Sequence, residues 1–278
     1  MAAKRVRRRL DRELLRRQMV NDLAAAQQLI TQGRITVGGA MANNAERQVA
    51  ADEAIEILAL PNRFVSRGGE KLEAALKQFE VTVEGRRAID VGASTGGFTD
   101  CLLQHGATKV TAIDVGYGQL HERLRDDPRV RNYERTTLRD LDVASVGGPA
   151  DVVVADLSFI SLRLVAADLE RLGTANAVWL ILVKPQFEAE RQEADRGRGV
   201  IRDPAIWERV LHEVKSTFAG YGLFVGGAMV SPITGKDGNT EFLVKLTRSE
   251  TFLGDQHIES AVASAKASTS TPLPAEGV

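Results

Sequence analysis

The stretch AIDVGASTGGFTD, from Ala88 to Asp100, constrains the fold of this chain more than any other. A short apolar run ends at Asp90, a glycine-rich turn follows, and an apolar helical pattern begins at Phe98. Strand, tight turn and helix in this order open a nucleotide-binding βαβ unit, in which glycine lets the backbone approach a ligand closely. The spacing is Asp-x-Gly-x-x-x-Gly-Gly, not the G-x-G-x-x-G of dinucleotide enzymes. The loop is therefore predicted to surround an uncharged nucleoside and its amino-acid tail rather than a pyrophosphate.

From residue 86 onward, strand-like and helix-like segments alternate, which predicts an α/β fold with a mainly parallel sheet and helices on both faces. The expected strands are residues 87–91, 109–114, 129–133, 151–155, 178–183, 223–230 and 241–246. The last two are expected to form an antiparallel hairpin at the sheet edge. The charged, glycine-bearing segment 188–203 is expected to be a mobile loop. The tail, rich in Ser, Thr, Ala and Pro, is expected to be disordered over residues 258–278.

The pattern of residues 1–60 predicts a separate small α/β domain with a basic start. Residues 1–20 carry eight basic and two acidic side chains, although the whole chain has a formal net charge of −1. A basic end on a near-neutral chain is typical of an anion-binding appendage, while a solvated basic face is an equally open interpretation. The pattern also includes helical spacing within residues 9–17, a second helix capped by Asn21 or Asp22, and a hairpin turn at Gly38-Gly39. Residues 61–65 are predicted to be a linker, followed by the second domain over residues 66–250.

The first domain resembles the S4 RNA-binding domain over about residues 7–60. The resemblance rests on two short basic helices followed by Gly-Arg-Ile-Thr-Val-Gly-Gly at 33–39. The chain departs from that family at the start of the second helix, where Asn21, Asp22 and Leu23 stand in place of a serine and basic residues. The resemblance therefore implies RNA contacts that rest mainly on arginines of the first helix. The expected RNA-binding residues are Arg5, Arg7, Arg8, Arg9, Arg12, Arg16, Arg17, Arg34 and Arg67.

Charged side chains close four of the expected parallel strands, and ligands of open α/β sheets sit beyond the carboxyl ends of the strands. These side chains are Asp90, Asp114, Asp156 and Lys184. An acid at the end of the second strand, here Asp114, is placed to hold the ribose hydroxyls of a nucleoside. One acid at a strand end is often only a helix cap, but four charged ends around one crevice predict a functional site.

Two lysines are candidates for the chemistry. Lys184 follows four apolar residues, and burial disfavours the charged ammonium form, so this lysine is a candidate general base. Lys71 lies in the first turn of an expected helix, where the helix dipole disfavours a cation. A lysine placed there without local benefit suggests a functional role, and a solvated lysine stays an open alternative at this point. Asp156 and Glu241 are the carboxylates expected to hold these lysines, although Glu241 taken alone fits a solvent-facing strand end.

In order and context, Lys71, Asp156, Lys184 and Glu241 resemble the Lys-Asp-Lys-Glu tetrad of the FtsJ-like ribose 2′-O-methyltransferases. The segments VSRGGEK, DVGYGQL, DLSFIS and VKPQF, with the first domain ahead of them, are similar to the TlyA family of bacterial rRNA cytidine 2′-O-methyltransferases, also named haemolysins. The resemblance covers about residues 7–248. It implies a Rossmann-like, FtsJ-type domain with a seven-stranded mainly parallel sheet, the tetrad as catalytic residues, and S-adenosylmethionine as the cofactor. The cofactor-binding residues it implies are Asp90, Gly92, Ser94, Thr95, Gly96, Gly97, Phe98 and Asp114.

By the same resemblance, the substrates are cytidines of 16S and 23S rRNA within 30S and 50S ribosomal subunits. The long basic start resembles the form of the family that modifies both subunits. A ribose hydroxyl is a poor nucleophile, so Lys184 is predicted to act as base or alkoxide stabiliser, oriented by Asp156, while Lys71 and Glu241 position the ribose. No metal is expected, because the four histidines show no ligand spacing. The single cysteine, Cys101, is expected to be buried in the first Rossmann-type helix.

Three other functions stay open at this point. A nicotinamide-dependent oxidoreductase is disfavoured by the missing G-x-G-x-x-G, and a non-catalytic ribosome assembly factor by the intact tetrad. A haemolysin acting on membranes is disfavoured by the few large apolar residues in the basic start. The chain has no apolar run of about 18 residues and no apolar segment typical of a secretory signal after its basic start. We therefore expect a cytoplasmic monomer without stable membrane association.

Overall fold

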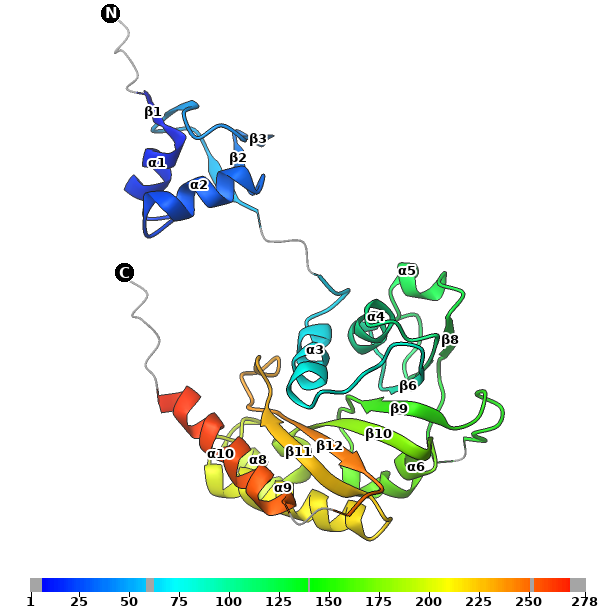
Figure 1. Cartoon of the computed structure of the whole chain (residues 1–278). Helices are drawn as coiled ribbons and strands as arrows, with labels where there is room; N and C mark the ends of the chain where they lie inside the picture. The colour runs from blue at the N-terminus through cyan, green and yellow to red at the C-terminus, as the bar shows by residue number, and fades with distance from the viewer. Residues whose placement is uncertain (1–6, 59–62, 140, 251–252, 271–278) are drawn as a thin grey trace, which may run out of the picture. The chain divides into compact units, whose positions relative to one another are not determined.

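The computed structural model describes residues 7–58, 63–139, 141–250 and 253–270 (Figure 1). The chain divides into two compact units, Met1–Asn62 and Arg63–Val278. Each unit has a hydrophobic core of its own.

The first unit packs two short helices against short antiparallel strands. Its elements are β1 (Arg7–Arg9), α1 (Leu10–Arg16), α2 (Leu23–Thr31), β2 (Ile35–Val37), β3 (Ala40–Met41), β4 (Gln48–Ala50) and β5 (Ile55–Ile57). Leu10, Leu14 and Ile30 are fully or almost fully buried and form the centre of this core. Asp22 caps α2 by accepting a hydrogen bond from the Ala25 amide at 2.7 Å, and the glycine pair at 38–39 turns β2 into β3 as predicted.

The second unit is built on a seven-stranded, mainly parallel sheet, as predicted, with the strand order β11-β12-β10-β9-β6-β7-β8. The strands are β6 (Arg87–Val91), β7 (Lys109–Ile113), β8 (Val130–Tyr133), β9 (Ala150–Ala155), β10 (Gly173–Val183), β11 (Phe224–Val230) and β12 (Phe242–Thr247). The strand β12 runs antiparallel to the rest of the sheet, where it pairs with both β10 and β11. The expected hairpin therefore exists, but one of its strands lies inside the sheet rather than at the edge.

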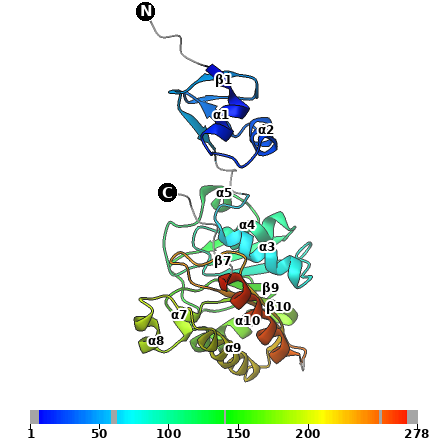
Figure 2. The same ribbon diagram turned by 90° about the vertical axis from the view of Figure 1, so that its left-hand side faces the viewer.

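Helices cover both faces of this sheet (Figures 1 and 2). They are α3 (Gly68–Gln78), α4 (Gly97–Gln104), α5 (Glu122–Arg125), the 3₁₀ helix η1 (Leu162–Leu164), α6 (Ala166–Glu170), α7 (Pro185–Glu188), α8 (Arg191–Arg196), α9 (Pro204–Ala219) and α10 (Gly254–Ser270). Alternation along a strand decides which helices it meets. In β9, Val152 and Val154 face α3 and α4, while Val153 and Ala155 face α6 and α9.

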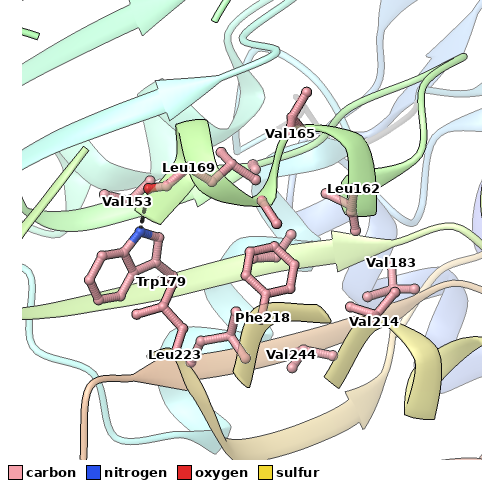
Figure 3. Packing of buried hydrophobic residues seen from close by; sticks show 14 of the residues in the cluster. Val153, Leu162, Val165, Leu169, Trp179, Val183, Val214, Phe218, Leu223 and Val244 are labelled. Carbon is pink, nitrogen blue, oxygen red and sulfur yellow. Dashed lines mark hydrogen bonds between the residues drawn. The ribbon is translucent and has the colours of Figure 1, made fainter. Parts of the chain in front are cut away.

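The larger core lies between the sheet and α6, α9 and α10. Figure 3 shows the part of it around Trp179 and Phe218. Trp179 of β10 is fully buried there, and its indole N–H donates to the Leu169 carbonyl at 2.8 Å. Phe218 of α9 packs in the same cluster. Cys101 is buried on the opposite face, as expected, and its surroundings raise the pKa of the thiol chiefly through burial.

Two segments predicted to lack regular structure contain helices. Within 188–203, α8 begins at a capping box formed by Glu190 and Glu193. The expectation of disorder from residue 258 is wrong up to residue 270, because α10 extends from Gly254 to Ser270; residues 271–278 lie outside the described part of the chain. Buried residues spaced three to four apart, Ile258, Ala261, Val262 and Ala265, give α10 a narrow apolar stripe despite its low overall hydrophobicity. Like the other helices of the described residues, α10 is too polar or too short to cross a bilayer.

Candidate active site

The four tetrad side chains line one cavity of about 440 Å³ at the carboxyl edge of the parallel strands. Lys71 comes from the first turn of α3, Asp156 follows β9, Lys184 follows β10, and Glu241 directly precedes β12. They belong to four segments far apart in the sequence. The sheet brings these segments together because parallel strands present their carboxyl ends at the same edge.

Within the cavity the tetrad forms two ion pairs. The Lys184 Nζ lies 2.5 Å from the Asp156 Oδ1 and also donates a hydrogen bond to the Ser158 Oγ at 2.8 Å. The Lys71 Nζ lies 2.5 Å from the Glu241 Oε2. Both lysines and Glu241 are buried, at 9%, 8% and 3% exposure for Lys184, Lys71 and Glu241. Each buried lysine nitrogen thus contacts a carboxylate, which offsets the cost of removing its charge from water.

The glycine-rich loop after β6 brings the tetrad elements together through close backbone packing. Gly92 has φ +80°, and a Cβ built on it would lie 2.6 Å from the Asp156 carbonyl oxygen. A Cβ on Gly97 would lie 2.2 Å from the Ser66 Oγ and 2.9 Å from the Gly69 amide nitrogen. Both glycines are therefore required by neighbouring protein segments. The sequence had suggested close approach of a ligand as the reason for glycine in this loop. The segment that a Cβ would clash with is the end of β9 at Gly92 and the start of α3 at Gly97.

A second cavity of about 430 Å³ adjoins the first and is centred on the end of β7. Asp114 lines it, with its Oδ2 accepting a hydrogen bond from the Ser94 amide at 2.7 Å and its Oδ1 accepting one from the Gly116 amide at 2.6 Å. Apolar residues form much of the remaining wall, among them Ile113, Val115 and Leu157. The two cavities share the following lining residues: Gly92, Ser94, Asp156 and Ser158. A ligand with two parts can therefore extend from one cavity into the other past Asp156.

The structure separates the predicted cofactor residues into two groups. The residues that line one or both cavities are Gly92, Ser94, Thr95, Gly97, Phe98 and Asp114. Asp90 and Gly96 line neither. Asp90 is fully buried beneath the loop, where its Oδ2 accepts a hydrogen bond from the Thr99 Oγ1 at 2.7 Å. Burial raises the pKa of Asp90 to about 7, and the nearby Asp156 carboxylate adds to the shift, while the bond from Thr99 opposes it.

Most of the predicted RNA-binding arginines of the first unit make intramolecular bonds. Arg16 and Arg17 donate to Glu13, and these bonds hold the pKa of the buried Glu13 carboxyl down at about 2. Three others also make bonds within the unit: Arg7 to Glu53, Arg9 to Asp11 and Glu46, and Arg34 to the Leu58 carbonyl. Arg8 and Arg12 are exposed, with no side-chain bond to the described residues. Arg5 lies outside the described residues, and Arg67 is exposed and lines the tetrad cavity.

Sequence reasoning missed three residues that line the cavities. Phe159 is 92% exposed in a left-handed backbone conformation with φ +65°, and its ring centroid lies 5.2 Å from that of Phe187. Ser158 bonds Lys184, and Lys236 lies in the turn between β11 and β12. Phe159 supplies an exposed aromatic ring at the second cavity. Its place three residues after Asp156, in DLSFIS, was the only available signal.

Comparison with known proteins bears on this site directly. Residues 64–248 match the model of the FtsJ-like methyltransferase family. The chain belongs to the FtsJ-like methyltransferase family. The match includes all four tetrad residues and both cavities. A nicotinamide-dependent oxidoreductase is thereby excluded as the identity of this domain.

Relatives of this FtsJ-like protein extend over both units. The 16S/23S rRNA (cytidine-2′-O)-methyltransferase TlyA of Mycobacterium tuberculosis is 41% identical over 258 residues, which cover 92% of this chain and 96% of the relative. Hemolysin A of Brachyspira hyodysenteriae is 39% identical over 219 residues, covering 78% and 90% of the two chains. A solved structure from Streptococcus thermophilus, which also carries a hemolysin designation, superposes with a TM-score of 0.70 at 33% identity, covering 96% of this chain and all of the other.

Proposed function

We propose that this protein transfers a methyl group from S-adenosylmethionine to the ribose 2′-hydroxyl of cytidines in 16S and 23S rRNA. The observation that carries the proposal is the pair of buried lysine–carboxylate contacts beside the border between two adjoining cavities. The relative named for this reaction, 41% identical over 92% of the chain, supports the same assignment.

The residues of the second cavity suit the cofactor. Its charged lining residues are Asp114 and Asp156, and its described lining contains no lysine or arginine, which suits an uncharged nucleoside joined to a positively charged sulfonium. Each Asp114 oxygen accepts one backbone hydrogen bond, and a carboxylate oxygen has a second lone pair left for a ribose hydroxyl. Asp156, at the shared border, favours positive charge there. When bound, S-adenosylmethionine supplies the electrophilic methyl group.

The first cavity is then the place of the acceptor ribose. Lys184, held by Asp156 and Ser158, acts on the 2′-hydroxyl as base or as a donor to the developing alkoxide. Lys71 and Glu241 lie on the same cavity and position the ribose. Because these groups are buried, the target nucleotide must leave its stack to reach them. The exposed ring of Phe159 offers a surface on which the extruded base stacks.

The first unit supplies affinity for RNA in this proposal. It has the helix and strand order of the S4-like pattern, and its exposed Arg8 and Arg12, which bond no side chain or carbonyl among the described residues, supply cations for phosphate contacts. The partners are the 30S and 50S ribosomal subunits, which places the protein in the cytoplasm, where it acts as a monomer.

The test is transfer of labelled methyl from S-adenosylmethionine to purified 30S and 50S subunits, with the modified ribose located by mass spectrometry of digested rRNA. Wild-type protein is expected to label cytidine 2′-oxygens, and Lys184→Ala is expected to lose at least about a hundredfold in rate, since acid–base groups contribute about 10² to 10⁴. Binding of S-adenosylmethionine to the variant, followed by calorimetry, controls for folding. Cofactor binding without methyl transfer by the wild-type protein to either subunit would instead point to a ribosome assembly factor or another RNA substrate.

A further inference from the structure

The tetrad cavity carries more positive charge than the tetrad itself. Its lining contains four cationic side chains, Arg67, Lys71, Lys184 and Lys236, and two carboxylates, Asp156 and Glu241, which is a net charge of +2. The two carboxylates form ion pairs with Lys71 and Lys184. The excess charge therefore belongs to Arg67 and Lys236. Both are exposed and have no hydrogen bond or ion pair with any described residue.

The loop that carries Lys236 is fixed at its base. The Gly235 amide donates to the Asn239 carbonyl at 2.9 Å, and a Cβ on Gly235 would lie 2.6 Å from the Glu241 Oε1. Asn239 is 1% exposed, and its side chain accepts from the Ile201 amide at 2.9 Å and donates to the Gly199 carbonyl at 2.8 Å. The backbone next to Lys236 is thus held against the tetrad carboxylate.

Arg67 lines the same cavity, but it lies on the segment that carries Lys71, the other partner of the Lys71–Glu241 ion pair. It immediately precedes α3, whose first turn carries Lys71, whereas Lys236 lies in the loop that leads to Glu241. Since Lys71 and Glu241 are in contact, Arg67 and Lys236 belong to the two segments that this contact joins. Each segment thus contributes one buried tetrad residue and one exposed cation.

We propose that Arg67 and Lys236 bind the two RNA phosphodiesters that flank the target ribose. The inference rests on the proposed function, because it assumes that the acceptor ribose enters this cavity. Every internal ribonucleotide has one phosphodiester on its 5′ side and one on its 3′ side. Two separate cations around one ribose site, neither paired with a described residue, match that distribution of charge. Solvent-exposed cations also bind phosphate at a smaller cost than buried ones. Lys236 is thus a substrate-positioning residue outside the tetrad.

The experiment compares Lys236→Ala with the charge-preserving Lys236→Arg and with Lys109→Ala. Lys109 is an exposed lysine at the amino end of β7, away from the carboxyl edge where the cavity lies, and it provides the same loss of charge. Steady-state methylation of the ribosomal subunit that the wild-type protein modifies is measured over a series of KCl concentrations. Calorimetric titration gives the affinity of each variant for S-adenosylmethionine.

Lys236→Ala is expected to raise the KM for the subunit about fivefold, in keeping with an exposed charge contact, with kcat within about twofold because the contact is kept in the transition state. The slope of log(1/KM) against log[KCl] is expected to become shallower by about 0.7 to 0.9, the loss of one phosphate contact. Lys236→Arg and Lys109→Ala are expected to resemble the wild-type protein, and cofactor affinity is expected to stay unchanged in all variants.

If Lys236→Ala changed the KM and the salt slope no more than Lys109→Ala does, the inference would be overturned and the proposed function would stay intact. Weaker binding of S-adenosylmethionine with an unchanged salt slope would overturn it as well, because Lys236 would then hold the carboxylate of the cofactor. A wild-type protein that methylates neither subunit would overturn the proposed function and this inference with it.

Discussion

Loss of the Lys71–Glu241 contact is expected to lower both stability and catalysis, and removal of the charge left behind is expected to restore the stability alone. The side chains of Lys71 and Glu241 are 10% and 3% exposed, and their charged atoms lie 2.5 Å apart, so solvent screens the pair little. Removing one partner of a buried pair costs about 3–5 kcal/mol, because the other charge stays buried. Glu241→Gln keeps the shape and one acceptor oxygen, so a loss near the lower end, about 3 kcal/mol, is expected.

Urea unfolding followed by tryptophan fluorescence measures this loss, since Trp179 and Trp207 are buried in the core of the second unit. With a slope of about 2 kcal/mol per molar urea, the midpoint of Glu241→Gln is expected to fall by about 1.5 M. Adding Lys71→Met to Glu241→Gln removes the uncompensated charge and is expected to restore most of the stability. Methyl transfer is expected to be lost in both variants.

The matched control is Asp255→Asn in the same unit. Asp255 lies 2.5 Å from the Lys215 Nζ, the same distance as in the tetrad pair, but it is 54% exposed. Exposed pairs of this kind contribute little to stability, so the midpoint is expected to move only slightly. Equal midpoint shifts for Glu241→Gln and Asp255→Asn would show that the tetrad pair is solvated and would refute the reasoning from burial.

Two further substitutions test the loop and the first unit. Gly97→Ala places a Cβ 2.9 Å from the Gly69 backbone nitrogen. It is expected to cost about 1–3 kcal/mol of stability and to lower kcat by displacing α3. Gly226→Ala, whose Cβ meets nothing nearer than 3.8 Å, is expected to have neither effect. Because the folded pKa of Glu13 is about 2, below its unfolded value, its ion pairs stabilise the first unit fully above about pH 4.5, and this contribution is lost as pH falls toward 2. Glu13→Gln is therefore expected to reduce amide hydrogen-exchange protection in α1 and α2 at pH 7 by about 2 kcal/mol after allowance for screening. The difference from wild type is expected to shrink in acid, and an equal loss at pH 3 and pH 7 would contradict the assignment.

Sequence patterns predicted most of the second unit because its strands are short apolar runs between turn signals. Each predicted strand from 87–91 to 151–155 is present within one residue at each end. The segments that misled were those whose stability depends on partners distant in sequence. The stripe of α10 contains small apolar residues and becomes a buried face only because β11 and α9 lie against it. The charged segment after Lys184 becomes α8, and Arg209 of α9 contacts Glu193 within it.

The amino-acid sequence by itself determined the glycine-rich loop and the succession of strands along the chain, because local periodicity carries that information, and its motifs supplied the tetrad candidates through their resemblance to the FtsJ-like family. Only the tertiary structure decided that Lys71 contacts Glu241, and that Asp90 supports the loop from beneath without lining a cavity. The tertiary structure likewise decided that Phe159 is exposed and that Lys236 shares a cavity with Lys71. These outcomes depend on how the strand ends and helix starts pack in three dimensions, and residues 170 positions apart in the sequence, such as Lys71 and Glu241, leave no local pattern of their contact.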